Sequence, residues 1–382
     1  MLGWEYPPHV TGGLAIACQG LVRGLSSRGV EVTFVAPRAA AAARDDGGAR
    51  VLGRSGEASA YARPADARPR SRLDAGPAYD GDLFAAVARY AERALALAGA
   101  ERFDLVHAHD WTAWPAGLAV ARAAGVPLVA HVHSLESDRS PRAVDARIAA
   151  LEREALHAAA RVVCVSAYTA GEVERRYGVP RARLAVLHNA VERGAPPPAP
   201  RVPDPRRPLV LFLGRVTDQK GPGVFLEAAA RVLELAPDVR FALCGTGDRL
   251  AGAIERAAEL GIARRVRFTG FLEREEVERM YRLADVFVLP SLSEPFGIAP
   301  LEAVARGVPV IVSRQSGVSE VLSGALKVDA WDVEGLADRI LAVLRRPALR
   351  ASLAARAARD LERLSWEGRG ERLEHLFEAV LA

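Results

Sequence analysis

Apolar residues recur at two alternating spacings along the first half of the chain. Between Leu14 and Leu25 they follow the 3.6-residue period of a helix with one buried face, and Gly29 ends this pattern. The β-branched run VEVTFVAP comes next and is typical of a buried strand. The further expected elements are a helix over 82–99, the strand FDLVHAH, a helix in GLAVARAAG, the strand VPLVAHVH, a helix around 142–158, the strand RVVCVS and a helix from Ala167.

Two stretches interrupt this alternation. Residues 39–81 are rich in Ala, Arg, Gly, Asp and Pro with little periodicity, which indicates a long, partly mobile insertion. The stretch ERGAPPPAPRVPDPRR cannot hold a helix or a strand, and it predicts a semi-rigid linker between domains.

A second alternating set begins at LVLFLG. Its expected elements are helices at 222–236, 248–260 and 273–283, the strands VRFALCG, VRFTG, DVFVLP and VPVIVS, and helices to the end. This βαβ order predicts an α/β protein of two Rossmann-like parallel-sheet domains facing each other across a cleft. The expected boundaries are 1–192 for the first domain, 193–208 for the linker, 209–364 for the second domain and 365–382 for a final helix.

Composition limits the classes of protein to which this chain can belong. Half of its 382 residues are hydrophobic, which is enough for two domains, and the net charge of +4 predicts no nucleic-acid partner. No stretch approaches the about 18 uncharged apolar residues of a membrane span, and no secretory signal is visible. The three cysteines lie far apart in apolar runs, which indicates buried free thiols in a reducing cytoplasm and not metal ligands.

The stretch SEPFGIAPLE at 293–302 places Glu294 and Glu302 at the two ends of a short turn. The buried run before it and the helix after it predict a strand, a tight loop and a helix start with Pro300 in its first turn. Amides at such a start bind anions, and the carboxylates can accept hydrogen bonds from hydroxyl groups, so the pattern suggests a nucleotide sugar. The alternative is a first-turn Glu302 favoured by the helix dipole and a solvated Glu294.

The loop GRVTDQKG places Arg215 and Lys220 on one short connection after the first strand of the second half. Lys220 and Lys327 are the only lysines among 51 basic residues, and the others are arginine. Each lysine is present either because its function requires an ammonium group or by chance. Two cations near an anion-binding helix start would neutralise a diphosphate that gains charge as its bond breaks. The alternative is a solvated basic turn.

With these motifs the chain resembles the retaining glycosyltransferases of family 4, the large group related to glycogen and sucrose synthases, which has the two-domain GT-B fold. The matching motifs are TGGL at 11–14, HAHDW at 107–111, HVHSLE at 131–136, VSAYTAGEV at 165–173, VLHNAVE at 186–192, GRVTDQKG at 214–221, CGTGD at 244–248, SEPFGIAPLEAVARGVPVIVS at 293–313 and GVSEVL at 317–322. The two glutamates followed by AxAxGxPV, together with the GR…KG loop, carry most of the specificity, whereas the GxG of CGTGD alone is weak.

The resemblance implies roles for residues of the second domain, the expected nucleotide-sugar-binding domain. It assigns Arg215 and Lys220 to the donor diphosphate, Glu302 to the nucleotide ribose and Glu294 to hydroxyls of the transferred sugar. The backbone amides expected to hold donor phosphate and sugar are those of Gly297, Ile298 and Ala299.

The resemblance also assigns residues of the first domain. His133 would face the reacting carbon, which makes it catalytic together with Arg215, Lys220 and Glu294. Gly12 and Gly13 would let backbone approach the donor closely. Asp110 and Trp111 would lie on the acceptor side. The final helix, 365–382, would cross back to the first domain.

Two other histidines have a simpler interpretation. His109 and His131 are predicted to be strand-end side chains satisfied by backbone groups. Two departures from the family pattern are Asn189-Ala190 in place of the common Asn-Gly, and Val10 where glycogen synthases carry a lysine. The second departure weakens an interpretation as a true glucan synthase.

No carboxylate nucleophile stands out, so we expect front-face transfer in which the departing diphosphate accepts the acceptor's proton. No metal and no cofactor beyond the nucleotide sugar are expected. Asp80-Gly81-Asp82 looks like a metal-binding DxD motif, but it directly precedes an apolar helix, so Asp82 is predicted to be a helix cap.

Several alternatives remain open. The expected reaction is retaining hexosyl transfer to a carbohydrate or other hydroxyl acceptor in the cytoplasm. The main alternative is a peripheral membrane glycosyltransferase with a lipid-linked acceptor, because the basic stretches 67–73 and 345–350 could contact anionic lipid weakly. A GT-B epimerase or phosphorylase and a non-catalytic binding protein are disfavoured by the motifs.

The first strand is expected to lie centrally in its sheet, yet only Met1 to Trp4 precede the turn-forming Pro7-Pro8. We therefore predict that Met1 is a late start or a truncation and that added apolar residues would raise the melting temperature.

Overall fold

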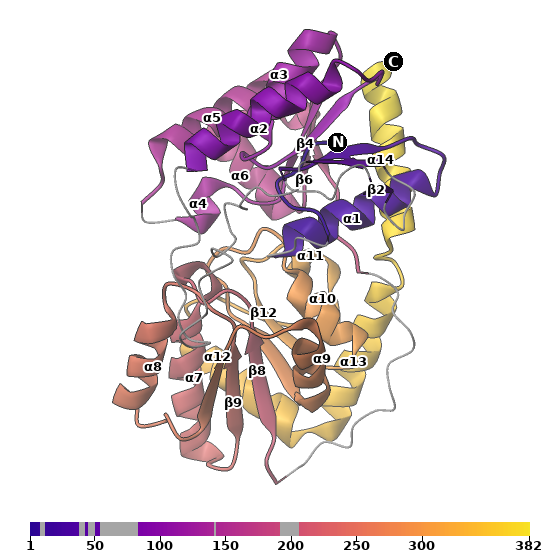
Figure 1. The fold of residues 1–382 in the computed structure, drawn as a ribbon. Coiled ribbons are helices and arrows are strands. Elements are labelled where there is room, and N and C mark those ends of the chain that lie inside the picture. The colour runs from indigo at the N-terminus through magenta and orange to yellow at the C-terminus, as the bar shows by residue number, and fades with distance from the viewer. Residues whose placement is uncertain (8–11, 38–42, 45–49, 54–82, 141–142, 192–205) are drawn as a thin grey trace. The chain divides into compact units, whose positions relative to one another are not determined.

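The computed structural model of this chain describes residues 1–7, 12–37, 43–44, 50–53, 83–140, 143–191 and 206–382 (Figure 1). These residues divide into two compact α/β units. Unit one holds the described residues as far as Val191 together with Leu364–Ala382, and unit two holds those between Arg206 and Arg363. The features that fall outside the described residues are Val10, most of the insertion 39–81 with its basic stretch and Asp80-Gly81-Asp82, and most of the linker 193–208.

Unit two is built on a six-stranded parallel sheet with the order β10-β9-β8-β11-β12-β13. This is the strand order of a Rossmann fold, in which the order reverses between β8 and β11. The strands are β8 (Leu209–Leu213), β9 (Arg240–Cys244), β10 (Val266–Gly270), β11 (Val286–Leu289), β12 (Val310–Ser313) and β13 (Leu326–Val328). All four residues of β11 are buried, as expected for a central parallel strand covered on both faces.

Helices connect and cover these strands. They are α7 (Pro222–Leu235), α8 (Leu250–Glu259), α9 (Arg274–Leu283), α10 (Ile298–Ala305), α11 (Val318–Val321), α12 (Val333–Arg345) and α13 (Pro347–Leu361). α7 packs against α8 and α12, while α10 packs against α13, and Figure 1 shows these two groups flanking the strands. The helices therefore form a layer on each side of the sheet.

Unit one contains two short sheets linked by the start of the chain. Their strands are β1 (Thr33–Val35), β2 (Ala43–Arg44) and β3 (Arg50–Leu52) in the order β1-β3-β2, and β4 (Val106–His109), β5 (Leu128–Val132), β6 (Arg161–Cys164) and β7 (Leu184–Val186) in chain order. Leu2 forms parallel bridges with both Val35 and Ala108. Its amide donates to His107 O at 2.8 Å, and Val35 N donates to Met1 O at 2.9 Å. The first residues thus occupy the expected central position.

The helices of unit one come from both ends of the chain. They are α1 (Gly13–Ser26), α2 (Leu83–Ala98), α3 (Trp114–Ala124), α4 (Glu136–Arg139), α5 (Ala146–Ala158), α6 (Ala167–Tyr177) and α14 (Trp366–Leu381). α14, yellow in Figure 1, lies along α1. A Cβ atom on Gly370 would overlap the backbone of Gly24, so the two helices approach at glycines. The last helix of the chain is therefore part of unit one.

Candidate functional site

The loop between β11 and α10 has the strand, turn and helix start that SEPFGIAPLE predicts. Gly297 directly precedes the helix with φ +97°, a conformation that favours glycine, and a Cβ atom there would lie 3.2 Å from Glu294 Cγ. The loop is tied to the segment after β12, because Glu294 N donates to Gln315 O and Gly317 N donates to Glu294 O, both at 2.9 Å. The first amides of α10, from Ile298 onward, have no acceptor within their own helix.

Lys220 and Glu294 form an ion pair, although they are 74 residues apart in sequence. Lys220 ends a short 3₁₀ turn, Asp218–Lys220, in the loop that follows β8, and Glu294 lies in the loop that follows β11. Ser291 Oγ also donates to Glu294 Oε2, at 3.2 Å. The two charged side chains are only 16% and 6% exposed. Removing an ion pair from water carries a large desolvation cost, so this pair marks a candidate functional site.

Arg215 lies in the same loop as Lys220, and its side chain is exposed. The loop is shaped by the segment after β9: Val216 N donates to Thr246 O at 2.9 Å, and Gly245 has φ +130°. A Cβ atom on Gly245 would overlap Gly214 O, and one on Gly247 would overlap Val216 O. The glycines of CGTGD thus allow this segment to pack closely against the loop that carries Arg215.

Glu302 lies in the second turn of α10 and contacts a partner that the sequence did not indicate. Tyr281 Oη donates to Glu302 Oε2 at 2.9 Å and lies 3.2 Å from Ala299 O. Burial raises the pKa of Glu302, and the Tyr281 hydroxyl opposes that rise. Tyr281 is fully buried within α9, where an aromatic residue is as typical of a core position as of a site. In the sequence, only the hydroxyl group of Tyr281 distinguished it from an ordinary apolar core residue.

Four histidines of unit one stack along two neighbouring strands and the residue that follows one of them. His107 and His109 lie in β4, His131 lies in β5, and His133 follows β5. His107 Nε2 and His131 Nδ1 are 3.1 Å apart, and His109 Nδ1 and His133 Nε2 are 2.9 Å apart. The prediction that His109 and His131 are satisfied by backbone groups was therefore wrong. Paired parallel strands place His109 opposite His131, so the rings stack on one another.

Burial lowers the pKa of all four imidazoles, and neighbouring histidines lower the pKa of His107, His109 and His131 further. These rings are therefore neutral near pH 7, and each offers one donor and one acceptor nitrogen. His133 is half-buried, whereas the other three are fully buried. Of the four histidines, His133 is thus the least buried residue.

Asp110 fixes the backbone that carries His133. Its Oδ1 accepts hydrogen bonds from His133 N at 2.7 Å and from Ser134 N at 3.2 Å, while Oδ2 pairs with Arg139 at 2.9 Å. Asp110 itself has φ +60°, a left-handed conformation uncommon for a side-chain residue. Strained residues of this kind gather at functional loops. Asp110 is 2% exposed, so its main contacts in the described structure are with the His133 loop.

The remaining predicted residues of unit one differ in exposure. Trp111, expected on the acceptor side, is fully buried and packs on Phe84 with ring centroids 5.8 Å apart. Gly12 precedes α1, and Gly13 is its first residue. A Cβ atom on Gly12 would meet nothing within 4 Å among the described residues. Trp111 therefore lies in the core of unit one, while a side chain at position 12 would meet none of the described residues.

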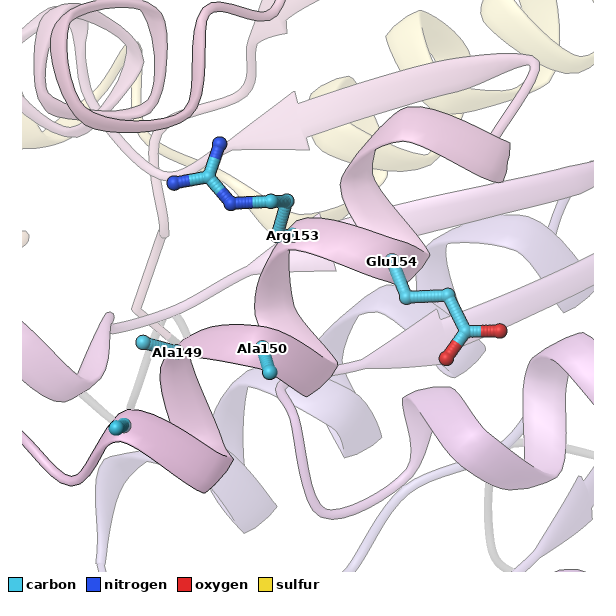
Figure 2. Close-up of a pocket in the computed structure, with 5 residues that line it drawn as sticks. Ala149, Ala150, Arg153 and Glu154 are labelled. Carbon is cyan, nitrogen blue, oxygen red and sulfur yellow. The ribbon is translucent and has the colours of Figure 1, made fainter.

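A shallow hollow of about 450 Å³ lies on the outer face of α5, away from these residues. Figure 2 shows Arg153 and Glu154 projecting from α5 beside Ala149 and Ala150. Glu154 pairs with Arg122 at 3.1 Å, and Arg153 lies over the ring of Tyr177. None of the predicted site residues lines this hollow, so we assign it no role.

The basic stretch 345–350 bears on the membrane alternative. Arg350 pairs with the buried Asp285 at 3.6 Å, and Arg345 donates to Leu235 O at 2.8 Å. Two of its arginines are therefore engaged within unit two. In the part of the chain that the structure describes, no helix has the length and apolar content needed to cross a bilayer.

Comparisons with known proteins agree with this architecture. The sequence profile described as Glycosyl transferases group 1 matches residues 199–360, and that described as Glycosyltransferase Family 4 matches residues 11–194. A D-inositol 3-phosphate glycosyltransferase of Thermobifida fusca is 33% identical over 69% of this chain and 67% of its own length. A glycogen synthase of Mycobacterium tuberculosis is 29% identical over 94% of this chain and 89% of its own length.

Among solved structures, the sucrose-phosphate synthase of Thermosynechococcus elongatus is similar with a TM-score of 0.78 and 21% sequence identity. The match covers 99% of this chain and 98% of that one. At this identity the likeness concerns the fold.

Proposed function

Because this chain belongs to the glycosyltransferases and has their GT-B fold of two Rossmann-like units, we propose that it transfers a hexosyl group from a nucleotide sugar to a hydroxyl acceptor, with retention of the anomeric configuration. The proposal concerns the donor, the stereochemistry and the acceptor. The observation that carries it is the buried Lys220–Glu294 pair beside the start of α10.

The Lys220–Glu294 ion pair is consistent with a diphosphate site in its donor-free state. Without a donor, Glu294 neutralises Lys220 in a largely buried position. A bound diphosphate would give Lys220 a stronger partner and leave Glu294 free to accept hydrogen bonds from sugar hydroxyls. The amides of Gly297, Ile298 and Ala299 would add donors for the same anion. This exchange of partners avoids leaving either charge buried alone.

The leaving diphosphate gains negative charge as its bond to the sugar breaks, so fixed cations lower the barrier more than they favour the bound donor. Lys220 and the exposed Arg215 would supply these cations. Glu302, fixed by Tyr281, would accept hydrogen bonds from the ribose hydroxyls. The proposal needs no metal ion, because side chains and amides carry the positive charge.

Retention follows if the acceptor attacks from the side that the diphosphate leaves, with the diphosphate accepting the acceptor's proton. In this arrangement Glu294 is engaged by Ser291 and by hydroxyls of the transferred sugar, so the proposal gives it no role as a nucleophile and takes the front-face course. The proposal assigns His133 a contact with the transferred sugar and assigns Asp110 and Trp111 the support of its loop. Proton NMR of the first product formed tests the stereochemistry, and an inverted anomer would contradict it.

The acceptor class is a sugar or polyol hydroxyl. Glycogen and an inositol phosphate stand in the names of two relatives, and these support a carbohydrate-like acceptor over a lipid-linked one. The engagement of Arg350 and Arg345 within unit two also disfavours a lipid-binding role for 345–350.

A thermal-shift screen of nucleotide sugars tests the donor proposal. A matching donor at about 100 times its Kd stabilises the folded protein by about 2.7 kcal/mol, and unmatched donors give little shift. Lys220→Ala should lose most of the shift, whereas Lys327→Ala should keep it. A panel of uridine, adenosine and guanosine diphosphate sugars that leaves the melting temperature unchanged would refute the proposal.

A further inference from the structure

We propose that Cys18, His109 and His133 form a site for a Zn²⁺ ion, and that occupation of this site inhibits the enzyme. The metal site is independent of the proposed function, whereas the inhibition rests on it through His133. The sequence had suggested only a buried free thiol for Cys18, because the three residues are far apart in the chain.

The three side chains converge from separate elements of unit one. Cys18 lies in α1, His109 in β4, and His133 follows β5. One ligand atom from each of them lies within 4.8 Å of the other two. His109 Nδ1 and His133 Nε2 are 2.9 Å apart, and two nitrogens that bind one zinc at about 2.0–2.1 Å in a tetrahedral site are separated by about 3.3 Å. A small opening of this hydrogen bond would therefore admit the ion.

No described residue fixes the tautomer of His109 through its outer nitrogen. His109 Nε2 is buried and has no hydrogen-bond partner among the residues that the structure describes. The proton now shared between His109 Nδ1 and His133 Nε2 can therefore be carried on the outer nitrogen of one ring. Both facing nitrogens are then free to bind the ion as neutral ligands.

The thiol of Cys18 must lose its proton to bind the ion. Burial raises the pKa of the Cys18 thiol, the carboxylates of Asp110 and Glu5 raise it further and the N-terminal ammonium group lowers it, so the metal-free thiol is protonated. Binding of Zn²⁺ would release this proton to solvent and form a zinc–thiolate bond. Water would complete the fourth position of the ion.

A second group of histidines is the alternative location. His107, His109 and His131 also bring ligand nitrogens within 4.8 Å of one another. All three are completely buried, so an ion would have no accessible ligand through which to enter. His133 is half-buried, so the Cys18 site has one ligand residue that is partly exposed. His109 belongs to both groups, so an ion at one of the two locations would prevent binding at the other.

Cobalt provides a direct test, because Co²⁺ replaces Zn²⁺ and reports a thiolate ligand by a near-ultraviolet charge-transfer band. The metal-free full chain should bind one Co²⁺ with this band, and Zn²⁺ should displace it. Cys18→Ser should lose the band. The matched control, Cys164→Ala, removes another buried thiol of unit one and should keep it. A wild-type protein without the band, or a Cys18→Ser variant that retains it, would overturn the site.

Zinc X-ray absorption on the wild-type protein serves if Cys18→Ser does not fold. The site predicts one sulfur at about 2.3 Å and nitrogens at about 2.0–2.1 Å. A spectrum with only nitrogen and oxygen neighbours would place the ion elsewhere and refute the proposal.

Inhibition is measured as the nucleotide-sugar turnover at rising free Zn²⁺, each variant being compared with its own zinc-free rate. Cys18→Ser should need at least about tenfold more zinc for half inhibition, because one of three protein ligands is lost. Equal sensitivity of wild type and Cys18→Ser would refute the regulatory part. Absence of any turnover in a protein that shows the cobalt band would instead count against the proposed function.

Discussion

Single carboxylates in this protein are buried with different partners, and the partner decides what each can do. Glu294 faces a cation, Glu302 faces a tyrosine hydroxyl, and Glu152 in unit one accepts from Tyr177 Oη and from Glu136 N. Of these three, only Glu294 is paired with a full positive charge to which an incoming anion can bind. We therefore assign Glu294 to the donor site and treat Glu152 as a structural residue.

Tyr281→Phe should weaken donor binding without unfolding the protein. The hydroxyl holds the Glu302 carboxylate, and a hydrogen bond to a charged group contributes about 1.5–3 kcal/mol, so the KM for the donor should rise about tenfold or more. The matched control is Tyr177→Phe, which removes a similar hydroxyl bond to Glu152 in unit one and should leave the donor KM unchanged. Steady-state kinetics compare the two, and an unchanged KM in Tyr281→Phe would remove Tyr281 from the site.

Glu152→Gln should reduce the dependence of stability on pH. Burial raises the pKa of Glu152 to about 7 from the ordinary value of 4.5, against the opposing effects of Tyr177, Glu136 N and Arg139. Between these values the folded state holds a proton that the unfolded state has released. The stabilisation from this proton is complete below about pH 4.5 and is lost as the pH rises through about 7, by up to about 3 kcal/mol.

Urea unfolding of wild type and Glu152→Gln at about pH 5 and about pH 8 measures this effect. The free energy of unfolding of the variant relative to wild type should be higher at the upper pH. A relative stability that is the same at both pH values would show that Glu152 ionises normally in the folded protein.

At the scale of elements, the contact between α1 and α14 depends on glycine. Gly370→Ala should force the helices apart and destabilise unit one by about 1–3 kcal/mol, even though alanine favours a helix over glycine by about 1 kcal/mol. Gly171→Ala in α6 is the control, because a Cβ atom there meets nothing within 4 Å among the described residues, and it should be neutral or stabilising. Thermal unfolding distinguishes the two, and a higher melting temperature for Gly370→Ala would contradict the close contact.

The long helices and the strands of four or five residues followed their expected positions, because several turns or alternations are enough to show a period. The strands β2, β3, β7 and β13 were not predicted, since two or three residues are too few to show a period, whereas the three residues of β1 lie within the longer run VEVTFVAP. β2 and β3 even lie within the expected insertion. The pairing of Lys220 with Glu294 was foreseeable in outline, because neighbouring parallel strands place their following loops at one edge. The histidine contacts could not be foreseen, because they depend on the register of β4 against β5.

For the whole molecule, the account predicts catalysis without a metal ion. EDTA should leave the transfer rate of the full chain within about twofold of its untreated value, or raise it where zinc was bound, because Arg215, Lys220 and backbone amides supply the positive charge. The measurement is turnover before and after dialysis against chelator. A rate that falls with EDTA and returns with Mg²⁺ or Mn²⁺ would show that a metal ion carries this charge instead.

The central claim is that Lys220 and Arg215 stabilise a departing diphosphate, and nucleoside diphosphate release from the matched donor tests it most directly. Lys220→Ala and Arg215→Ala should each lower this rate by about 100-fold or more with the fold intact. Lys327→Ala, which removes the only other lysine, should stay within about twofold of wild type. Near-normal release by Lys220→Ala or Arg215→Ala, or an equal loss in Lys327→Ala, would contradict the account.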